Sequence, residues 1–341
     1  MTPTPTPTPS PIGVLVMAYG TAAGPDDIER YYTDIRGGRA PGPEHLQELR
    51  DRYAAIGNAF PLLDTTRAQA EGLVERLNAS SDGPTFRAYL GMKHSPPFIP
   101  DGVAQMRSDG VERGVGIVMA PHWSGMSVET YVERTRAAAE ESEGAPAFSF
   151  VRSYAVHPAF VRFLTSRLDE ALARLEPQER AGAAVIFSAH SLPTRTLPDG
   201  SMRCKTCDCA DSCRYRDGLR ETAGAVAAAL ELPHHTIAWQ SAGRTNDPWW
   251  GPAIEDVIPQ LAAAGHPAVV VCSAGFVADH LEILFDLDIE ARAIAERAGI
   301  RFERTRMPNA DPEYLEVLAQ VVRDHLAGVA DAGPVPQAAP S

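Results

Sequence analysis

The sequence predicts an α/β protein made of two similar doubly wound domains, each with a parallel sheet between two layers of helices. Three observations support this fold class. Apolar runs of strand length alternate with longer helical segments along the chain. The run at 184–187 has no polar alternation, which is typical of a parallel strand covered on both faces. The alternation of strands and helices occurs twice, with about four strands in each half.

In the first half, short apolar runs that stop at Gly or Pro predict the strands, and longer mixed segments between them predict the helices. The expected strands are 13–17, 86–90, 116–120 and 148–151, and the expected helices are 26–35, 44–56, 62–77, 101–108 and 128–141.

The second half begins with a long helix and repeats the pattern. Its expected strands are 184–188, 237–241, 268–272 and 302–304, and its expected helices are 158–175, 215–230, 254–264, 278–298 and 314–326. We expect a Rossmann-like domain at 12–155, a second at 156–310 that carries the cysteine cluster, and a helix at 311–330 that packs back. The Thr/Pro-rich residues 1–11 and the residues 331–341 are expected to be disordered tails.

Length and charge exclude several classes of protein. The chain has 341 residues, enough for two domains, and a formal net charge of −13. This acidity argues against a nucleic-acid-binding protein and against docking on anionic lipid. We find no apolar run long enough for a membrane span and no signal peptide, and no GxGxxG or P-loop motif follows a strand. A cytoplasmic monomer is the expectation.

The most informative strand ends near His190. In open parallel sheets, ligands bind beyond the carboxyl ends of the strands, so His190 lies where a working residue is expected. The alternative is a turn histidine bonded to a neighbouring carbonyl.

A row of carboxylates follows a later strand. Glu282, Asp286 and Glu290 are four residues apart, which predicts one stripe of a helix. Like charges at this spacing repel one another unless a cation is present or protons are shared. Apolar residues surround the row, which favours a path for protons or hard cations, and an exposed acidic face is the alternative.

Four cysteines lie within ten residues: Cys204, Cys207, Cys209 and Cys213. In a reducing compartment this C-x2-C-x-C-x3-C spacing indicates a metal site rather than disulfides. Zinc and a [2Fe–2S] cluster both accept four thiolates, and the tight C-x-C step favours the cluster.

Several motifs together resemble the ferrochelatases, which insert ferrous iron into a porphyrin. They are Ser-Ala-His-Ser-Leu-Pro at 188–193, Gln-Ser-Ala-Gly-Arg at 240–244, Pro-Trp-Trp-Gly-Pro at 248–252 and Phe-Val-Ala-Asp-His-Leu-Glu at 276–282. The resemblance extends from about residue 13 to 326. It implies two Rossmann-like domains with the porphyrin in a cleft between them.

The segments at 17–21 and 30–36 are similar to the branch that uses coproporphyrin III, and the four cysteines to its actinobacterial members with a [2Fe–2S] cluster. The resemblance implies iron insertion into coproporphyrin III in haem biosynthesis. It implies His190 and Glu282 as the catalytic pair, with an unpaired imidazole that accepts a proton or passes on the metal. The implied Fe²⁺ ligands are His190, Glu282 and Tyr19, with Asp286 and Glu290 extending the acidic path. The implied substrate-binding residues are Tyr19, Arg36, Arg52, His94 and Tyr131.

Other functions stay open at this point. Within the same enzyme class, the alternatives are a protoporphyrin IX ferrochelatase and a chelatase for another tetrapyrrole or metal, such as cobalt. Outside it, a haem-binding or iron–sulfur sensor protein would keep the cysteines without needing the carboxylate row. A serine hydrolase is disfavoured because no GxSxG motif is present.

Overall fold

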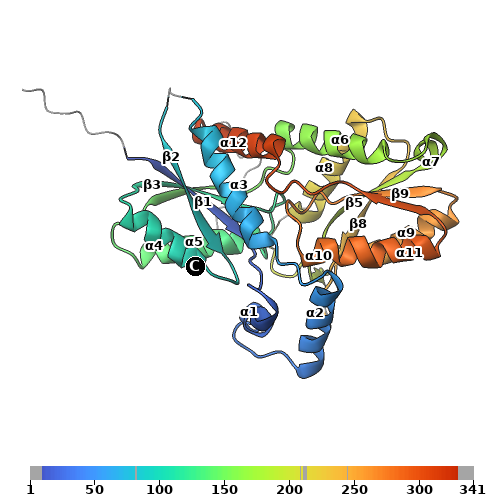
Figure 1. Ribbon diagram of the computed structural model, residues 1–341, viewed down its shortest axis with the longest axis horizontal. Coiled ribbons are helices and arrows are strands. Elements are labelled where there is room, and N and C mark those ends of the chain that lie inside the picture. Colours follow the sequence, from blue (N-terminus) through green and yellow to red (C-terminus); the bar gives the residue numbers. More distant parts are fainter. Residues whose placement is uncertain (1–9, 81–82, 208, 210–212, 244, 329–341) are drawn as a thin grey trace, which may run out of the picture.

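The structure, a computed structural model, describes residues 10–80, 83–207, 209, 213–243 and 245–328. The described residues form two parallel four-stranded sheets, one in each half of the chain (Figure 1). The strand orders are β2-β1-β3-β4 and β8-β5-β9-β10, the same topology when each half is counted from its own first strand. This confirms two Rossmann-like units. The tails expected to be disordered lie outside the described residues, except for Ser10 and Pro11.

The first sheet has β1 at its centre, paired in parallel with β2 and β3. One face packs against α3, and the other packs against α4 and α5. The strands are β1 (Ile12–Ala18), β2 (Phe86–Met92), β3 (Arg113–Val118) and β4 (Ala147–Val151), and the helices are α3 (Leu62–Leu77), α4 (Ile99–Ser108) and α5 (Val128–Glu140).

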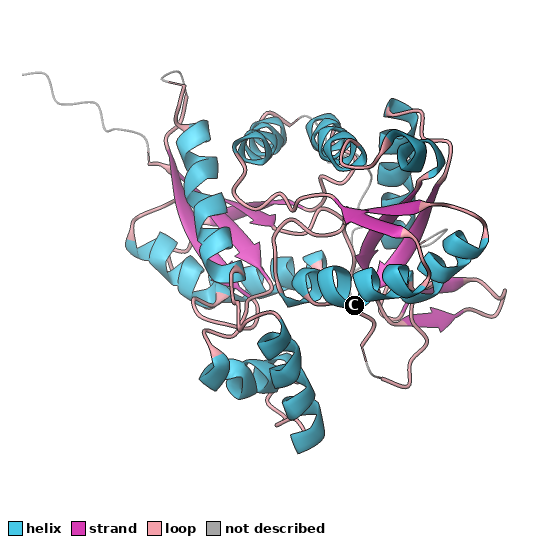
Figure 2. Cartoon of the chain, turned by 45° about the vertical axis from the view of Figure 1, so that its right-hand side comes forward, coloured by secondary structure: helices cyan, strands magenta, loops and turns pink. Residues whose placement is uncertain are grey.

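The second sheet has β5 at the equivalent place, paired in parallel with β8 and β9. Helices lie on both faces of each sheet, as Figure 2 shows. The strands are β5 (Ala184–His190), β8 (His235–Gln240), β9 (Ala268–Cys272) and β10 (Arg301–Arg304). The helices are α6 (Pro158–Leu172), α7 (Pro177–Gly182), α8 (Arg214–Ala229), α9 (Ile254–Ala263), α10 (Leu281–Leu284) and α11 (Arg292–Arg297).

One hydrophobic core joins the two halves. Along β1, Val14 and Val16 face this shared core, whereas Leu15 and Met17 face the opposite side, as the two-residue period of a strand requires. Helix α12 (Pro312–Leu326) lies between α3 and α6 and contributes to the same core. The two halves therefore form one packed body.

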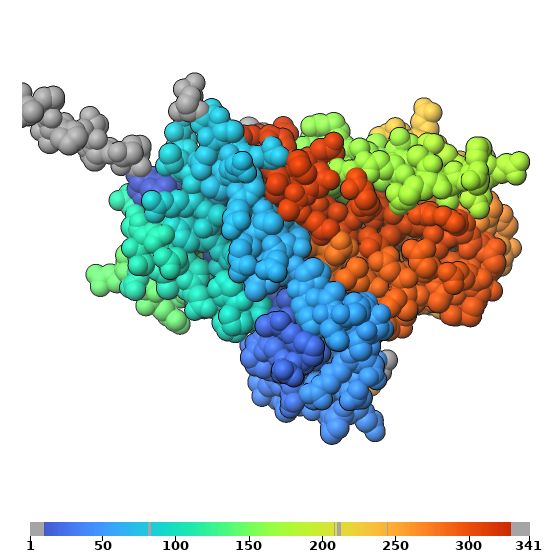
Figure 3. All heavy atoms as spheres, viewed as in Figure 1, coloured from blue at the N-terminus to red at the C-terminus, as the bar shows by residue number. Residues whose placement is uncertain are grey.

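A helical layer projects from this body and is the blue lobe in Figure 3. It follows the carboxyl end of β1 in the chain. It consists of the short helix η1 (Pro25–Asp27), α1 (Ile28–Ile35) and α2 (Pro43–Ala55). Leu281 of α10, from the second half, packs against its apolar cluster. The layer therefore contacts both halves.

The predicted single helix at 278–298 is wrong. The segment consists of α10, a π-helix η2 (Asp286–Ala291) and α11. Its π-type hydrogen bond joins the N–H of Glu290 to the carbonyl of Phe285 at 3.0 Å. The small hairpin of β6 (Thr194–Thr196) and β7 (Met202–Cys204) is also absent from the prediction. No described helix combines the length and apolar character needed to cross a membrane.

Candidate functional site

The site lies where the strand order of the second sheet reverses. From β5 the chain moves to β8 on one side, and then to β9 on the other. A crevice forms beyond the carboxyl ends at such a point. His190 is the last residue of β5, and α10 with Glu282 follows the loop after β9. The topology therefore explains why these two residues, distant in sequence, meet.

Glu282 lies between two imidazoles. One carboxylate oxygen is 3.4 Å from Nε2 of His190, and the other is 3.5 Å from Nε2 of His280. The side chain of Gln240 donates to the backbone carbonyl of Glu282 at 2.9 Å. Nδ1 of His190 contacts the backbone carbonyl of Ser191. That carbonyl accepts only from a protonated Nδ1, so Nε2 is the ring nitrogen that points to Glu282.

The charges of this pair reinforce each other. Burial lowers the pKa of His190, but the carboxylate of Glu282 outweighs it and raises the pKa to about 9. Burial likewise opposes the charge of Glu282, but His190 holds the pKa of that carboxyl well below its usual range. At neutral pH the site therefore holds an imidazolium–carboxylate pair. The expected unpaired imidazole is corrected, because Glu282 lies within ion-pair distance.

Asp286 is the second carboxylate of the row, and it is buried. It pairs with Arg52 of α2 and accepts a hydrogen bond from the Ser241 hydroxyl. Burial raises the pKa of Asp286 to about 6, although Arg52 acts against this rise. Glu282 is partly buried and Glu290 is exposed, so Asp286 is the most deeply buried of the three carboxylates. Arg52, expected to bind substrate, is thus engaged with Asp286 and lies over the ring of Phe285 at 4.7 Å.

The first half contributes Tyr19, which follows β1. The residue is 43% exposed, and its ring is tilted by 56° to that of His94, with the centroids 4.6 Å apart. His94 is buried, with Nδ1 2.6 Å from a carboxylate oxygen of Asp34. The protein atoms packed around part of the phenol, and then the negative charge of Glu282, raise the pKa of Tyr19. This coupling places the end of β1 and Glu282 in one electrostatic environment.

A cavity of about 490 Å³ is lined by residues of the first half alone, Asp34, Lys93 and Arg134 among them, and neither His190 nor Glu282 lines it. The Lys93 ammonium donates to Thr130 at 2.7 Å and lies 5.2 Å from the ring centroid of Tyr131. Burial lowers the pKa of Lys93 to about 8. Tyr131 is buried beneath this lysine, whereas Arg36 is exposed at the end of α1.

Sequence reasoning missed His280, Lys93 and Arg134. The sequence offers a local indication for Lys93 and for His280. Lys93 directly precedes His94 at a strand end, and His280 lies two residues before Glu282. Arg134 carries no comparable signal, because its hydrogen bond to the carbonyl of Lys93 depends on where α5 lies relative to the loop after β2.

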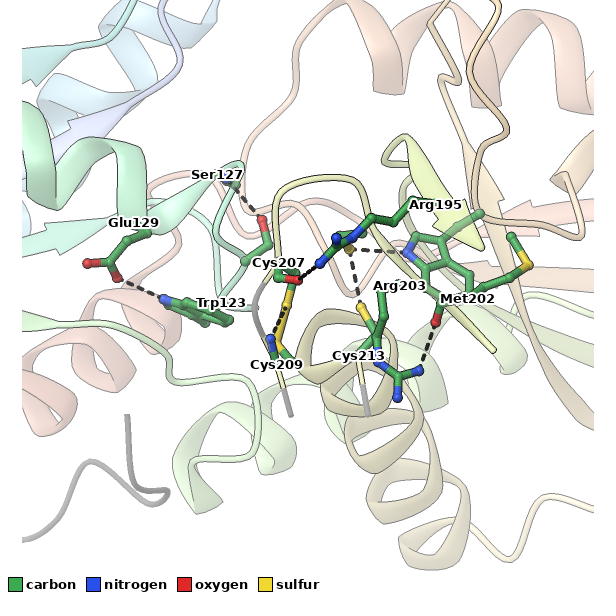
Figure 4. Close-up of a disulfide and its surroundings, with 12 residues drawn as sticks. Trp123, Ser127, Glu129, Arg195, Met202, Arg203, Cys207, Cys209 and Cys213 are labelled. Carbon is green, nitrogen blue, oxygen red and sulfur yellow. Dashed lines mark hydrogen bonds between the residues drawn. A yellow bond between two sulfur atoms is a disulfide. The ribbon is translucent and has the colours of Figure 1, made fainter. Parts of the chain in front are cut away.

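Figure 4 shows Cys207, Cys209 and Cys213 near Trp123 and Ser127. Cys213 is the N-cap residue of α8, and Gly125 lies against the backbone of Thr206 and Cys207. Cys207 and Cys209 form a disulfide, while Cys204 and Cys213 are free thiols whose sulfurs are 3.2 Å apart. The hydrogen bond from Cys204 lowers the pKa of Cys213 to about 6. The expectation of four thiolates without a disulfide is corrected, because each sulfur takes another sulfur as its partner. Among the described residues, no three His, Cys, Asp or Glu side chains are arranged to hold a metal ion.

Comparison with known proteins shows the family to which this chain is similar. The model of the family described as Ferrochelatase matches residues 11–326. A relative from Anoxybacillus flavithermus, named coproporphyrin III ferrochelatase, is 43% identical over 92% of this chain and 96% of its own. The protein of the same name from Bacillus subtilis is also 43% identical, over 91% of this chain and 96% of its own.

Solved structures agree on the fold. SirB from Bacillus subtilis, in a structure with Fe³⁺, superposes with a TM-score of 0.56 at 9% identity, covering 94% of this chain and 97% of that chain. A sirohydrochlorin chelatase in complex with cobalt superposes with a TM-score of 0.53 at 9% identity, covering 93% and 96% of the two chains. At this identity the likeness concerns the fold alone.

Proposed function

Because this chain belongs to the ferrochelatase family, we propose that it inserts Fe²⁺ into coproporphyrin III, in haem biosynthesis. The observation that carries the proposal is the contact between His190 and Glu282 at the reversal point of the second sheet, with Nε2 and the carboxylate 3.4 Å apart. The names of the relatives, which are similar over nearly the whole chain, support the choice of substrate.

Metal insertion requires that pyrrole nitrogens lose protons while Fe²⁺ loses water. We assign proton acceptance to His190, whose Nε2 faces the site. Its resting proton must first leave to solvent, and a cation bound to Glu282 favours this loss because it cancels the charge that holds the proton. Tyr19, from the end of β1, and Glu282 are the proposed oxygen ligands of the incoming Fe²⁺. Asp286 and Glu290, at decreasing depth, are the proposed path between the site and solvent.

Recognition of the substrate depends on its carboxylates. Coproporphyrin III carries four propionates and protoporphyrin IX carries two, so cations beside the site favour the former. We propose Arg36, Lys93 and Arg134 as contacts, with His94 and Tyr131 shaping the wall. Lys93 has a pKa depressed by burial, and a bound carboxylate would supply the missing negative charge. Arg52 acts on the substrate only if it leaves Asp286.

We also propose that the cysteine segment holds a [2Fe–2S] cluster when its disulfide is reduced. The donor set suits such a cluster. The indole N–H of Trp250 donates to the sulfur of Cys204, and the backbone N–H of Cys209 donates to that of Cys207, both at 3.2 Å. Such hydrogen bonds are those that tune bound thiolates. Anaerobic reconstitution with iron and sulfide should give a visible iron–sulfur spectrum in the wild type and none in Cys213→Ser. Zinc uptake without that spectrum would contradict the cluster.

The remaining proposals concern the whole chain. We propose domains at 12–155 and 156–310, with the segment at 311–330 packing back. Helix α12, which lies against α3 and α6, supports this last point. We further propose that the protein acts as a cytoplasmic monomer without nucleic-acid or membrane partners, on the basis of its net charge of −13.

An anaerobic absorbance assay tests the function. Purified protein is mixed with Fe²⁺ and either coproporphyrin III or protoporphyrin IX. We expect rapid metallation of the first porphyrin and little of the second. His190→Ala should abolish metallation while porphyrin binding persists, and His235→Ala, which removes an exposed histidine at the far end of β8, should leave the rate unchanged. Equal rates with both porphyrins would contradict the substrate, and full activity of His190→Ala would contradict the site.

A further inference from the structure

The peptide group between His190 and Ser191 is held from both sides. Its N–H donates to the backbone carbonyl of Gln240 at 2.7 Å, and its C=O accepts a hydrogen bond from the Tyr215 hydroxyl at 2.9 Å. Nδ1 of His190 contacts the next carbonyl, that of Ser191. The orientation of this peptide therefore sets the direction of the imidazole, so that its Nε2 points toward Glu282.

Tyr215 is itself rigidly placed. It is the second residue of α8 and only 7% exposed, and its ring packs on Trp239 with the centroids 5.4 Å apart. Cys213 precedes α8 as its N-cap residue, and its sulfur lies 3.2 Å from that of Cys204. The hydroxyl therefore reaches the site from an anchored helix end.

A second anchor holds the same turn. Trp250 donates its indole N–H to the sulfur of Cys204, and its carbonyl accepts from the Ser191 hydroxyl at 2.8 Å. The turn after β5 is thus fixed between Tyr215 and Trp250, each of which is tied to the cysteine segment. Removal of either contact would let the turn move.

We infer that Tyr215 is a positioning residue for His190, which it serves by holding the backbone carbonyl of that histidine. The inference rests on the proposed function in taking His190 as the group that handles pyrrole protons. Packing alone needs no hydroxyl at this position, since phenylalanine fills the same volume. The hydroxyl adds one directed hydrogen bond, and its acceptor belongs to the residue that bears the imidazole.

Tyr215→Phe tests the inference because it removes one oxygen and keeps the ring. The first readout is the Nδ1–H signal of His190 in ¹H–¹⁵N NMR of the protein without substrate. We expect its exchange with solvent to accelerate roughly tenfold, because the peptide that holds it becomes mobile. The second readout is kinetic: kcat for iron insertion should fall roughly tenfold while KM for coproporphyrin III stays unchanged.

Tyr154→Phe is the matched control. It removes a buried phenol that bonds to the Tyr314 hydroxyl at 2.9 Å, away from the site. It should lower stability without changing either readout. If Tyr215→Phe leaves both the exchange rate and kcat at the wild-type values, the inference is overturned. If the wild type fails to metallate coproporphyrin III, the proposed function fails, while the NMR comparison still decides whether Tyr215 holds His190.

Discussion

At the scale of single residues, the site is defined by a proton shared between two groups. Burial alone would leave His190 neutral, but Glu282 holds a proton on it until the pH approaches about 9. A base that is protonated in the resting state must be released before it can accept a pyrrole proton. The arriving Fe²⁺ is suited to this release, because a cation bound to Glu282 cancels the charge that raises the pKa of His190.

Glu282→Gln should lower the pKa of His190 well below about 9, because burial remains and the carboxylate that raises it most is gone, while Ser191 and Asp286 keep only part of the rise. Ring-proton NMR between pH 5 and 10 measures this midpoint. Glu290→Gln also removes one negative charge, but from an exposed position, and should leave the midpoint of His190 near 9. A midpoint that stays near 9 in Glu282→Gln would show that another group holds the proton.

The His190–Glu282 pair should also make the free energy of unfolding depend on pH. The pKa of His190 is higher in the folded chain than in the unfolded one, so its proton stabilises the fold fully below pH 6.5. That contribution disappears as the pH rises to about 9. Urea unfolding of the wild type should therefore show a decreasing free energy over this window. The decrease should be much smaller in Glu282→Gln, and an equal decrease in both proteins would assign it to other groups.

At the scale of elements, the strands were predictable and the functional segment only in part. Buried apolar runs identified 268–272 without error and missed two residues of β5, one of them His190. The segment at 278–298 has a helical pattern, but its π-helical turn places Asp286 beside Arg52, which lies 234 residues away in sequence. No local pattern encodes such a distant partner. The sulfur pairing likewise depends on how the segment folds, which spacing alone leaves open.

The Arg52–Asp286 contact joins α2 to η2 and yields a prediction at this scale. Arg52→Gln leaves a buried carboxylate without its cation, and we expect a loss of roughly 2–4 kcal/mol in the free energy of unfolding at pH 7.5. The loss should shrink near pH 5, because Asp286, with a pKa of about 6, is then mostly neutral. Urea denaturation at both pH values measures it.

Arg50→Gln is the control on the same helix. Arg50 pairs with Glu29 at 3.5 Å, and both side chains are largely exposed, so its loss should cost less than about 1 kcal/mol. Equal losses in the two variants, or a loss in Arg52→Gln that does not depend on pH, would mean that Asp286 is not the group that Arg52 compensates.

At the scale of the whole molecule, the two halves share a core although each has its own sheet. Residues of β1, β5, α3, α6, α8 and α12 belong to one apolar cluster. A polar contact crosses the same boundary: the Gln69 amide of α3 donates to the carbonyls of Val277 and Asn309, at 3.0 and 2.9 Å. Val277 belongs to the loop that leads to Glu282, so the joint between the halves also supports the site.

This joint predicts that the protein unfolds in a single transition rather than half by half. Calorimetric and van't Hoff enthalpies should agree, and tryptophan fluorescence and far-UV circular dichroism should give one midpoint. Gln69→Leu removes the amide donor from both carbonyls, although that of Val277 still accepts from the N–H of Asn309 at 3.0 Å. The substitution should cost about 1–3 kcal/mol while keeping one transition. Gln105→Leu, which loses a bond within α4 only, should cost far less. Two separate transitions in the wild type would show that the halves are independent, and the site between them would then depend on bound substrate for its geometry.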